Sequence, residues 1–512
     1  MNAAEAAYFE ELKSEKLELE SENFQLRIRV AEATEQLEWL KRQLFGKRSE
    51  KVIEKRDERQ LLLFDLDGLH KPEEEETKKV AAHSRKKPNR NGQDAIALPA
   101  DIPIKTTFID LPEEEKVCKE TGERLVQIGE EVSHKLAHQP GSYYIKEIIR
   151  PKYALPKREE AGIFTASLPD SLLPRCRADE SLLAEIITKK FADHLPLYRI
   201  EEILKREGIK ISRKLLSQWV MRCGQALKPL YEVMLKRILA SRNLFIDEMP
   251  IKLQDKVKCR KGYLWVIVGG NEASPPYRVY DFRPNRKHQN AFDLLKDYQG
   301  GLHSDKYGAY QKLAEKKQVT WYPCFSHIRR KFFEAEAGDP EFRKWVLRKI
   351  RYLFMLERVG WARSAEERLR IRKEKELPLL DELIRKVKLR LSEGKLLPKS
   401  KFREALCYFL GLVPYLKNYI EDPYARLDNN VAERALRALA IGRKNWLFFG
   451  SLDGADAGAV LFSLVQTCRG LGINPREYLE DVMRRIMGHS NQKLHELLPD
   501  EWLAARQKLQ SS

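Results

Sequence analysis

The hydrophobic positions near the start of the chain follow a seven-residue repeat. Over residues 5–50 one series recurs every seven positions, and a second series follows it three positions later. The first series is Phe9, Lys16, Asn23, Val30, Leu37 and Leu44, and the second is Leu12, Leu19, Leu26, Ala33 and Leu40. This spacing predicts a leucine-zipper coiled coil over residues 1–52 that pairs two copies of the chain. The alternative is one long amphipathic helix that packs on its own protein.

Two segments without a helical repeat follow. Residues 53–103 hold charge runs, turn formers and prolines, and we expect a flexible linker because such a stretch buries too little apolar surface to fold. Its basic residues either contact phosphates or are solvated charges; they are Arg85, Lys86, Lys87 and Arg90. Residues 104–165 are rich in β-branched and aromatic positions with a strand-like pattern, which predicts a small β-rich module.

Residues 175–241 contain three segments with helical periodicity. Gly208 is placed to end the second helix and Ser212 to cap the third. Two helices joined by a short glycine-containing turn fit a helix-turn-helix and fit an ordinary helical hairpin equally well. In a helix-turn-helix, three residues early on the recognition helix would reach base edges or phosphates: Arg213, Lys214 and Gln218.

The pattern changes to alternating strands and helices from residue 242 to residue 450. Three successive strand candidates come first, at 243–254, 261–270 and 277–282, and the first two are apolar enough to lie inside a sheet. Two further strand candidates alternate with helices up to residue 338, and residues from about 338 to 422 are helical and basic. A last helix is predicted from about 428 to 440, before a separate C-terminal helical region at 451–512.

The amino-acid composition indicates what kind of partner the chain binds and in which compartment it is expected. The 512 residues include 94 Lys and Arg against 76 Asp and Glu, which gives a formal net charge of +18. Such an excess favours nucleic acid, because neutralising phosphates releases condensed counterions; solubility alone is the alternative. The longest apolar strip falls far short of the ~20 residues that cross a bilayer, so no membrane partner is expected. Seven scattered cysteines and an N-terminus without a secretory pattern predict a reducing, cytoplasmic location.

Three acidic residues stand out by their context. Asp247 lies in the middle of an apolar strand, Asp305 ends a later strand, and Glu433 lies at the start of the last helix of the core. Each of them alone has the alternative role of a helix cap or a salt-bridge partner. Together, three convergent carboxylates would hold hard divalent cations, and two Mg²⁺ or Mn²⁺ ions support phosphodiester chemistry. We therefore expect all three to be catalytic and metal-binding.

The order of these acids along the chain is more specific than the acids themselves. They are separated by intervals of 58 residues (247 to 305) and 128 residues (305 to 433). Three adjacent strands, a second Asp after a crossover helix and a Glu on a late helix describe an RNase H-like nuclease core. The second interval accommodates the helical block at 338–422 as an α-helical insertion. The predicted fold is therefore a multidomain α/β protein whose RNase H-like core has the layout of DDE transposases.

Six segments resemble the insertion sequence 66 type of bacterial DDE transposase. They are QLEWLKRQLFGKRSEK (36–51), ADHLPLYRIEEIL (192–204), FIDEMPIKL (245–253), LHSDKYGAY (302–310), CFSHIRRKFFEA (324–335) and DNNVAERALRALAIGRKNWLFFGS (428–451). By this resemblance, Asp247, Asp305 and Glu433 form the catalytic triad. The resemblance implies an enzyme that cleaves both ends of an insertion sequence and joins the 3′-OH ends to target DNA. It also implies small accessory proteins encoded by the same element.

One departure from that family concerns zinc. The family carries a four-cysteine zinc module in the 104–160 region, as two Cys-x-x-Cys pairs. Here Cys118 is kept, but Thr121 stands where the second cysteine would fall, and the later pair has no counterpart. One sulfur ligand cannot hold a structural zinc ion, which takes four ligands. We expect the β-rich module to fold without zinc.

For the remaining residues near the three acids, the sequence indicates a function less specifically. Glu248 follows Asp247 in the strand and is expected to support the site rather than bind metal. His327, Arg330 and Lys331 share a helix that either contacts the phosphate or is solvated. Four basic residues after Glu433 are expected to bind phosphates: Arg434, Arg437, Arg443 and Lys444. Trp446 and Phe448 are expected to pack in the core.

Two other functions remain open from the sequence. A Mg²⁺-dependent RNase H-like nuclease would cut nucleic acid without joining ends to a target. A dimeric DNA-binding regulator would have an inert core, and three acids in this layout count against it.

Overall fold

The computed structural model describes residues 102–117, 124–139, 141–154, 163–254, 258–270, 277–336, 338–394, 396–397 and 399–511. The predicted coiled coil (1–52), nearly all of the linker (53–103) and the pair Cys118 and Thr121 lie outside the described residues. The described residues all belong to one of the two units into which the chain divides, Asn89–Ser512.

The first described strands form a small sheet in the order β1-β3-β2, with β4 added to β3. Their bounds are β1 Ile104–Phe108, β2 Val126–Gln139, β3 Ser142–Ala154 and β4 Phe164–Thr165, and a short 3-10 helix, η2, spans Glu113–Lys116. β2 and β3 form a long antiparallel hairpin, and Gly141 in its turn adopts a φ of +83°. A small hydrophobic cluster supports the sheet: Leu111, Leu125, Tyr153 and Ala166.

Four helices follow where the periodicity predicts helical structure. They are α2 Glu180–Phe191, α3 Leu197–Arg206, α4 Arg213–Ala226 and α5 Lys228–Leu239. Gly208 ends the turn after α3 with a φ of +77°, and the Ser212 hydroxyl accepts a hydrogen bond from the Leu215 N–H at 3.3 Å. Both predicted helix boundaries are confirmed. The third predicted segment is divided at Leu227, because Pro229 in the first turn of α5 has no N–H to continue the α4 ladder.

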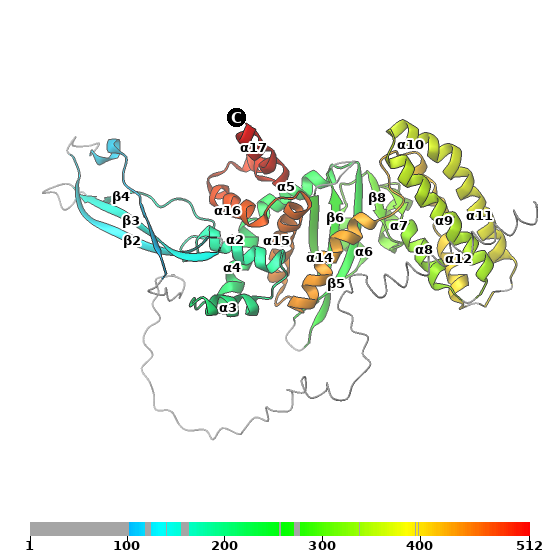
Figure 1. The fold of residues 1–512 in the computed structure, drawn as a ribbon, viewed down its shortest axis with the longest axis horizontal. Helices are drawn as coiled ribbons and strands as arrows, with labels where there is room; N and C mark the ends of the chain where they lie inside the picture. Colours follow the sequence, from blue (N-terminus) through cyan, green and yellow to red (C-terminus); the bar gives the residue numbers. More distant parts are fainter. Residues whose placement is uncertain are drawn as a thin grey trace, which may run out of the picture. The chain divides into compact units, whose positions relative to one another are not determined.

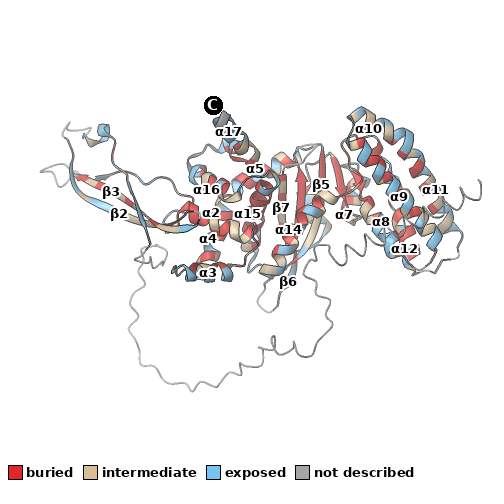
Figure 2. Cartoon of the chain, in the orientation of Figure 1, coloured by how far each residue is buried: buried red, intermediate tan, exposed pale blue. Residues whose placement is uncertain are grey.

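A five-stranded sheet in the order β7-β6-β5-β8-β9 lies at the centre of the described chain. Its strands are β5 Asn243–Leu253, β6 Arg260–Gly269, β7 Tyr277–Arg283, β8 Gly301–Ser304 and β9 Thr320–Pro323. β5, β6 and β7 pair antiparallel, whereas β8 runs parallel to β5 and β9 runs parallel to β8. The intervening helices are α6 His288–Leu294, α7 Gly308–Glu315 and α8 Phe325–Glu334. Buried residues concentrate in these strands and in the helices beside them (Figure 2).

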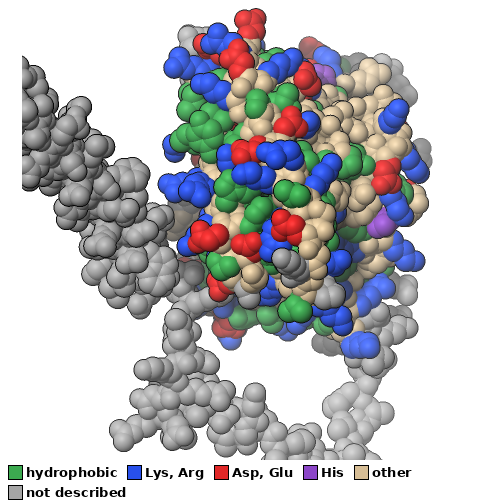
Figure 3. All heavy atoms as spheres, turned by 90° about the vertical axis from the view of Figure 1, so that its right-hand side faces the viewer, with side chains coloured by type: hydrophobic (Ala, Val, Ile, Leu, Met, Phe, Trp, Pro, Cys, Tyr) green, Lys and Arg blue, Asp and Glu red, His purple; other side chains and the backbone are tan. Residues whose placement is uncertain are grey.

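Helices fill the interval between β9 and the helix of Glu433 (Figure 1). They are α9 Pro340–Trp361, α10 Ala365–Ile371, the π-helix η4 Arg372–Glu376, α11 Leu377–Ser392, α12 Lys401–Leu410, α13 Val413–Leu416 and the 3-10 helix η5 Asn418–Ile420. Lys and Arg side chains are interspersed with exposed hydrophobic ones on the face in Figure 3. Four basic residues line a hollow of ≈ 870 Å³ on α9: Arg348, Lys349, Arg351 and Arg358.

The helix that carries Glu433, α14, spans Asn430–Trp446 and is longer than predicted. Gly442 does not end it, because the Trp446 ring packs over this glycine: a Cβ there would lie 2.5 Å from the ring. The C-terminal elements are α15 Leu452–Gly470, α16 Pro475–Arg485, η6 Ile486–Gly488, η7 Asn491–Leu497 and α17 Pro499–Ser511. α14 packs against β5, and α15 packs against β7 and α4. Among the described helices, none combines the length and the apolar character that a bilayer crossing requires.

Candidate active site

The first predicted catalytic acid, Asp247, lies in the middle of the central strand β5, where it pairs with Val266 of β6. Its Oδ1 accepts a hydrogen bond from the Glu248 N–H at 2.8 Å. Burial, followed by the negative charges of Glu248, Asp305 and Glu433, raises the pKa of Asp247 to about 8. The carboxyl is therefore held where an anion is unfavourable unless a cation is near.

Asp305 follows the last residue of β8, the strand that runs parallel to β5. Asp247 and Asp305 are separated by 58 residues in the sequence (247 to 305). Because β5 and β8 are neighbours, the sheet brings the two acids close together. Burial raises the pKa of Asp305, and the charge of Glu433 adds to the shift. Its Oδ1 is buried and has no hydrogen-bond partner among the described residues.

Glu433 lies in the first turn of α14, the helix that packs against β5. Asn429 fixes this end of the helix, because its side-chain amide donates to the Ile246 carbonyl, next to Asp247, at 2.8 Å. Glu433 Oε1 is buried and, within the described chain, forms no hydrogen bond. The structure thus brings all three predicted acids into one electrostatically coupled group.

Glu248 adds a fourth negative charge to this group. Its buried carboxylate accepts hydrogen bonds from Arg286 Nε at 2.6 Å and from the Tyr310 hydroxyl at 3.0 Å. Burial raises the pKa of Glu248, and the charge of Asp305 raises it as well. Both of its oxygens are engaged by protein donors, which suits a supporting role better than metal ligation.

The donor set fits a hard divalent cation. Carboxylate oxygens are the ligands that Mg²⁺ and Mn²⁺ prefer. The oxygens Asp305 Oδ1 and Glu433 Oε1 are buried without a hydrogen-bond partner in the described part of the chain, and a bound cation would satisfy both.

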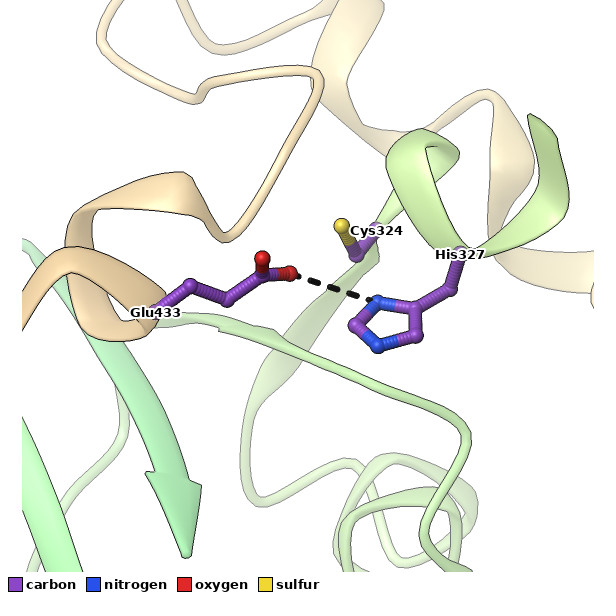
Figure 4. A group of neighbouring side chains, drawn as sticks. All are labelled: Cys324, His327 and Glu433. Carbon is purple, nitrogen blue, oxygen red and sulfur yellow. Dashed lines mark ion pairs between the residues drawn. The ribbon is translucent and has the colours of Figure 1, made fainter. Parts of the chain in front are cut away.

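Cys324 and His327 lie beside Glu433. Of these two residues, only His327 stood out in the sequence. Cys324 precedes α8 as its N-cap residue, and His327 lies in the first turn of that helix. His327 Nδ1 lies 3.7 Å from Glu433 Oε1 (Figure 4). Cys324 Sγ accepts a hydrogen bond from the Asn429 N–H at 3.2 Å. The Cys-x-x-His spacing directly after a strand is the signal that could have identified Cys324, because residues three apart share a helix face.

The predicted phosphate-binding residues lie on the two helices of the site. Arg330 and Lys331 are exposed on α8, and their charges help lower the pKa of His327, after the larger effect of burial. On α14, three basic residues are exposed: Arg434, Arg437 and Lys444. Arg443 instead donates from Nη1 to the Pro250 carbonyl of β5 at 2.9 Å. The structure therefore engages Arg443 in packing α14 against β5.

The predicted recognition-helix residues line a groove to which none of the three acids contributes. Arg213, Lys214 and Gln218 are exposed on α4 and line a groove of ≈ 1000 Å³. The other wall of this groove includes residues 445–451, which follow Glu433 on and after α14.

The two aromatic residues of that wall differ in their packing. The Trp446 ring packs edge-on against Phe191 and Phe462, as predicted for a core residue. Phe448 is 43% exposed, so the prediction that it packs in the core is wrong. The positive φ of Leu447, +67°, redirects the chain just before Phe448 and leaves its ring on the wall of the groove.

Comparison with known proteins finds matching family models and similar curated proteins. The family model described as "Transposase IS66 family" matches residues 175–457, "IS66 C-terminal element" matches 463–499, and "Transposase C of IS166 homeodomain" matches 32–106. The uncharacterized protein y4hP of Sinorhizobium fredii is 33% identical over 502 residues, which cover 92% of this chain and 88% of that protein. The uncharacterized protein y4jD of the same organism is 30% identical over 505 residues, 94% of this chain and 96% of that protein. The chain therefore belongs to the IS66 family of transposases.

Proposed function

We propose that the protein binds the terminal inverted repeats of an insertion sequence, hydrolyses the phosphodiester bond at each end and joins the resulting 3′-OH ends to target DNA. The observation that carries this proposal is the convergence of Asp247, Asp305 and Glu433, whose charges act on one another. The strand order and the mixed pairing of β5–β9 support an RNase H-like core in which these acids form a DDE triad.

In this proposal the triad holds two Mg²⁺ (or Mn²⁺) ions, which when bound activate the attacking oxygen and stabilise the leaving oxygen. The protein itself contributes by positioning the acidic side chains. Asn429 ties the start of α14, where Glu433 lies, to the Ile246 carbonyl of β5, next to Asp247. Arg286 and Tyr310 hold Glu248 so that its charge stays beside the triad. The side chains are thereby ordered before DNA binds, which favours both hydrolysis and strand transfer.

DNA contact is proposed for two surfaces. In a helix-turn-helix formed by α3 and α4, Arg213, Lys214 and Gln218 would contact the transposon ends. Beside the triad, the basic residues of α8 and α14 would contact phosphates: Arg330, Lys331, Arg434, Arg437, Arg443 and Lys444.

The remaining parts of the chain have proposed roles as well. The segment 1–52 would pair two copies, so that two transposon ends are brought together. The helical insertion at about 338–422 would belong to the catalytic core of residues 242–450.

The α4 surface gives a quantitative prediction. Lys214→Ala should weaken binding to end DNA and reduce the slope of log affinity against log salt by about 0.9, because one phosphate contact is lost. Fluorescence anisotropy over a salt series measures this slope. Lys236→Ala on α5 is the matched control, since Lys236 is exposed but does not line the groove. An unchanged slope for Lys214→Ala, or an equal change for both variants, would contradict the assignment.

An end-joining assay distinguishes the proposed function from its alternatives. The wild-type protein, an oligonucleotide that carries the element's end and a supercoiled target are combined with Mg²⁺ or Mn²⁺. A transposase produces both nicked ends and end–target joints, whereas a nuclease without strand transfer produces nicks alone. A regulator with an inert core produces neither product but still binds the ends. Nicks without joints under both metals would refute the strand-transfer step.

A further inference from the structure

Cys324, His327 and Glu433 form a cluster whose chemistry differs from that of the acidic triad. One ligand atom from each residue lies within 4.8 Å of the other two: a sulfur, an imidazole nitrogen and a carboxylate oxygen (Figure 4). Cys324 is 2% exposed, whereas the side chains of His327 and Glu433 are 24% and 27% exposed. The cluster thus combines a buried sulfur with two side chains that are each partly exposed.

We propose that Cys324 Sγ, His327 Nδ1 and Glu433 Oε1 bind one Zn²⁺ ion, and that this ion inhibits the enzyme by engaging Glu433. The donor set selects the metal, because thiolate and imidazole ligands favour zinc whereas Mg²⁺ takes oxygen ligands. Inhibition rests on the proposed function, in which Glu433 belongs to the catalytic triad. Zinc binding itself does not depend on that function.

One of the three separations between the ligand atoms already suits a tetrahedral ion. Zinc bonds of about 2.0–2.3 Å place neighbouring ligands roughly 3.3–3.8 Å apart in a tetrahedral site. The distance of 3.7 Å between His327 Nδ1 and Glu433 Oε1 falls in this range. Both of these atoms are buried and lack a hydrogen-bond partner in the described residues, so an ion would satisfy two polar atoms at once. Three protein ligands leave the fourth position for a water molecule.

Burial raises the pKa of the Cys324 thiol to about 12, so a metal ion must displace its proton, and two backbone N–H groups favour the negative charge that results. The Asn429 N–H donates to Cys324 Sγ at 3.2 Å, and the His327 N–H is also directed at this sulfur. When zinc binds, the thiol proton leaves to solvent, the sulfur–zinc bond forms, and the imidazole keeps its proton on Nε2. No electron transfer is involved. The two N–H groups then stabilise the thiolate that results.

Binding of zinc would compete with catalysis for one carboxylate. Glu433 Oε1 lies 3.7 Å from His327 Nδ1, and the same side chain acts electrostatically on Asp247 and Asp305. With its carboxylate drawn toward α8, Glu433 no longer completes the acidic triad. Because zinc binds nitrogen and sulfur ligands more tightly than Mg²⁺ does, low zinc concentrations can oppose a large excess of Mg²⁺.

Cobalt substitution in the full-length protein tests the site without DNA. Co²⁺ bound to a thiolate gives a charge-transfer band in the near ultraviolet, and zinc should remove this band at one equivalent per site. Cys324→Ser should abolish the band, and both Cys324→Ser and His327→Asn should weaken zinc affinity by more than about 100-fold, since even outer-shell partners contribute 10–100-fold. Cys407→Ser, which changes an exposed cysteine on α12, should keep both the band and the affinity.

The outcomes separate the zinc site from the proposed function. No band in the wild type, a band that survives in Cys324→Ser, or its loss in Cys407→Ser would overturn the site. A band with the expected pattern supports the zinc site even if the wild type fails to cleave transposon ends. Failure to cleave would refute the proposed function and leave the zinc site standing. Where cleavage occurs, zinc should inhibit the wild type at concentrations that displace cobalt. Cleavage insensitive to bound zinc would overturn the inhibitory role.

Discussion

Asp247→Asn is expected to reduce both end cleavage and strand transfer by about 1000-fold or more. Asparagine keeps the shape of the side chain but removes the charge that the central strand contributes to the acidic group. A loss of about 4 kcal/mol in transition-state stabilisation corresponds to this factor, and a metal ligand contributes several kcal/mol. Single-turnover assays with labelled end DNA measure both steps.

The matched control for this variant is Asp297→Asn. Asp297 lies before β8 with its side chain 76% exposed and pairs only with Lys296 among the ion pairs of the described chain. This control should keep wild-type rates, and both variants should keep wild-type affinity for end DNA. If Asp247→Asn cleaves at more than a tenth of the wild-type rate, the triad assignment is wrong.

Asp247→Asn should also make the metal-free protein more stable. Burial and neighbouring negative charges raise the pKa of Asp247 to about 8, above the 3.8 of an ordinary aspartate. A carboxyl group whose pKa is raised in the folded state destabilises the fold when it ionises. This destabilisation is absent near pH 4, grows as the pH rises and is complete above about pH 8. Asparagine does not carry this cost. A gain of about 1 kcal/mol would raise the Tm by about 2–4 °C, so melting curves at pH 5 and pH 8 should show a larger gain at pH 8.

The central sheet could be predicted well from the sequence, because strands buried inside a sheet consist largely of apolar residues. The strands β5 and β6 are apolar over most of their length, and few other structures accommodate such short apolar runs. Against that background Asp247 is conspicuous, since an acid inside a buried strand needs a reason to be there. Asp305 and Glu433 were predictable for a related reason, because the order of elements places them at the same part of the sheet.

The residues that position the three acids were not predictable in the same way. Asn429 bonds to Ile246 across 183 positions of the chain and to Cys324 across 105 positions. No periodicity or local propensity marks such pairs, because only the tertiary fold brings them together. The end of α14 shows the same effect: the helix predicted to end at about 440 continues to Trp446, whose ring packs over Gly442.

Arg372→Met is expected to lower the free energy of unfolding by about 3–5 kcal/mol, the cost of removing one partner from a buried ion pair. The Arg372 side chain is fully buried and donates to the Glu357 carboxylate at 2.6 and 2.8 Å. Without the guanidinium, Glu357 faces Glu376, whose pKa is raised to about 8 by burial and by the charge of Glu357. Urea denaturation followed by circular dichroism measures the loss, and Arg370→Met, at an exposed position, should stay within about 0.5 kcal/mol of the wild type.

The same substitution should also impair catalysis, because Arg372 holds the segment that leads to α14. Its guanidinium donates to the carbonyls of Tyr419, Asp422 and Ala425 at 2.7, 2.5 and 2.8 Å, a few residues before Asn429 and Glu433. Adding Glu357→Leu to Arg372→Met removes the unpaired buried charge and should recover most of the stability. It cannot restore the three carbonyl contacts, so cleavage should stay low in the double variant. Recovery of cleavage together with stability would show that the insertion supports the active site only through its general stability.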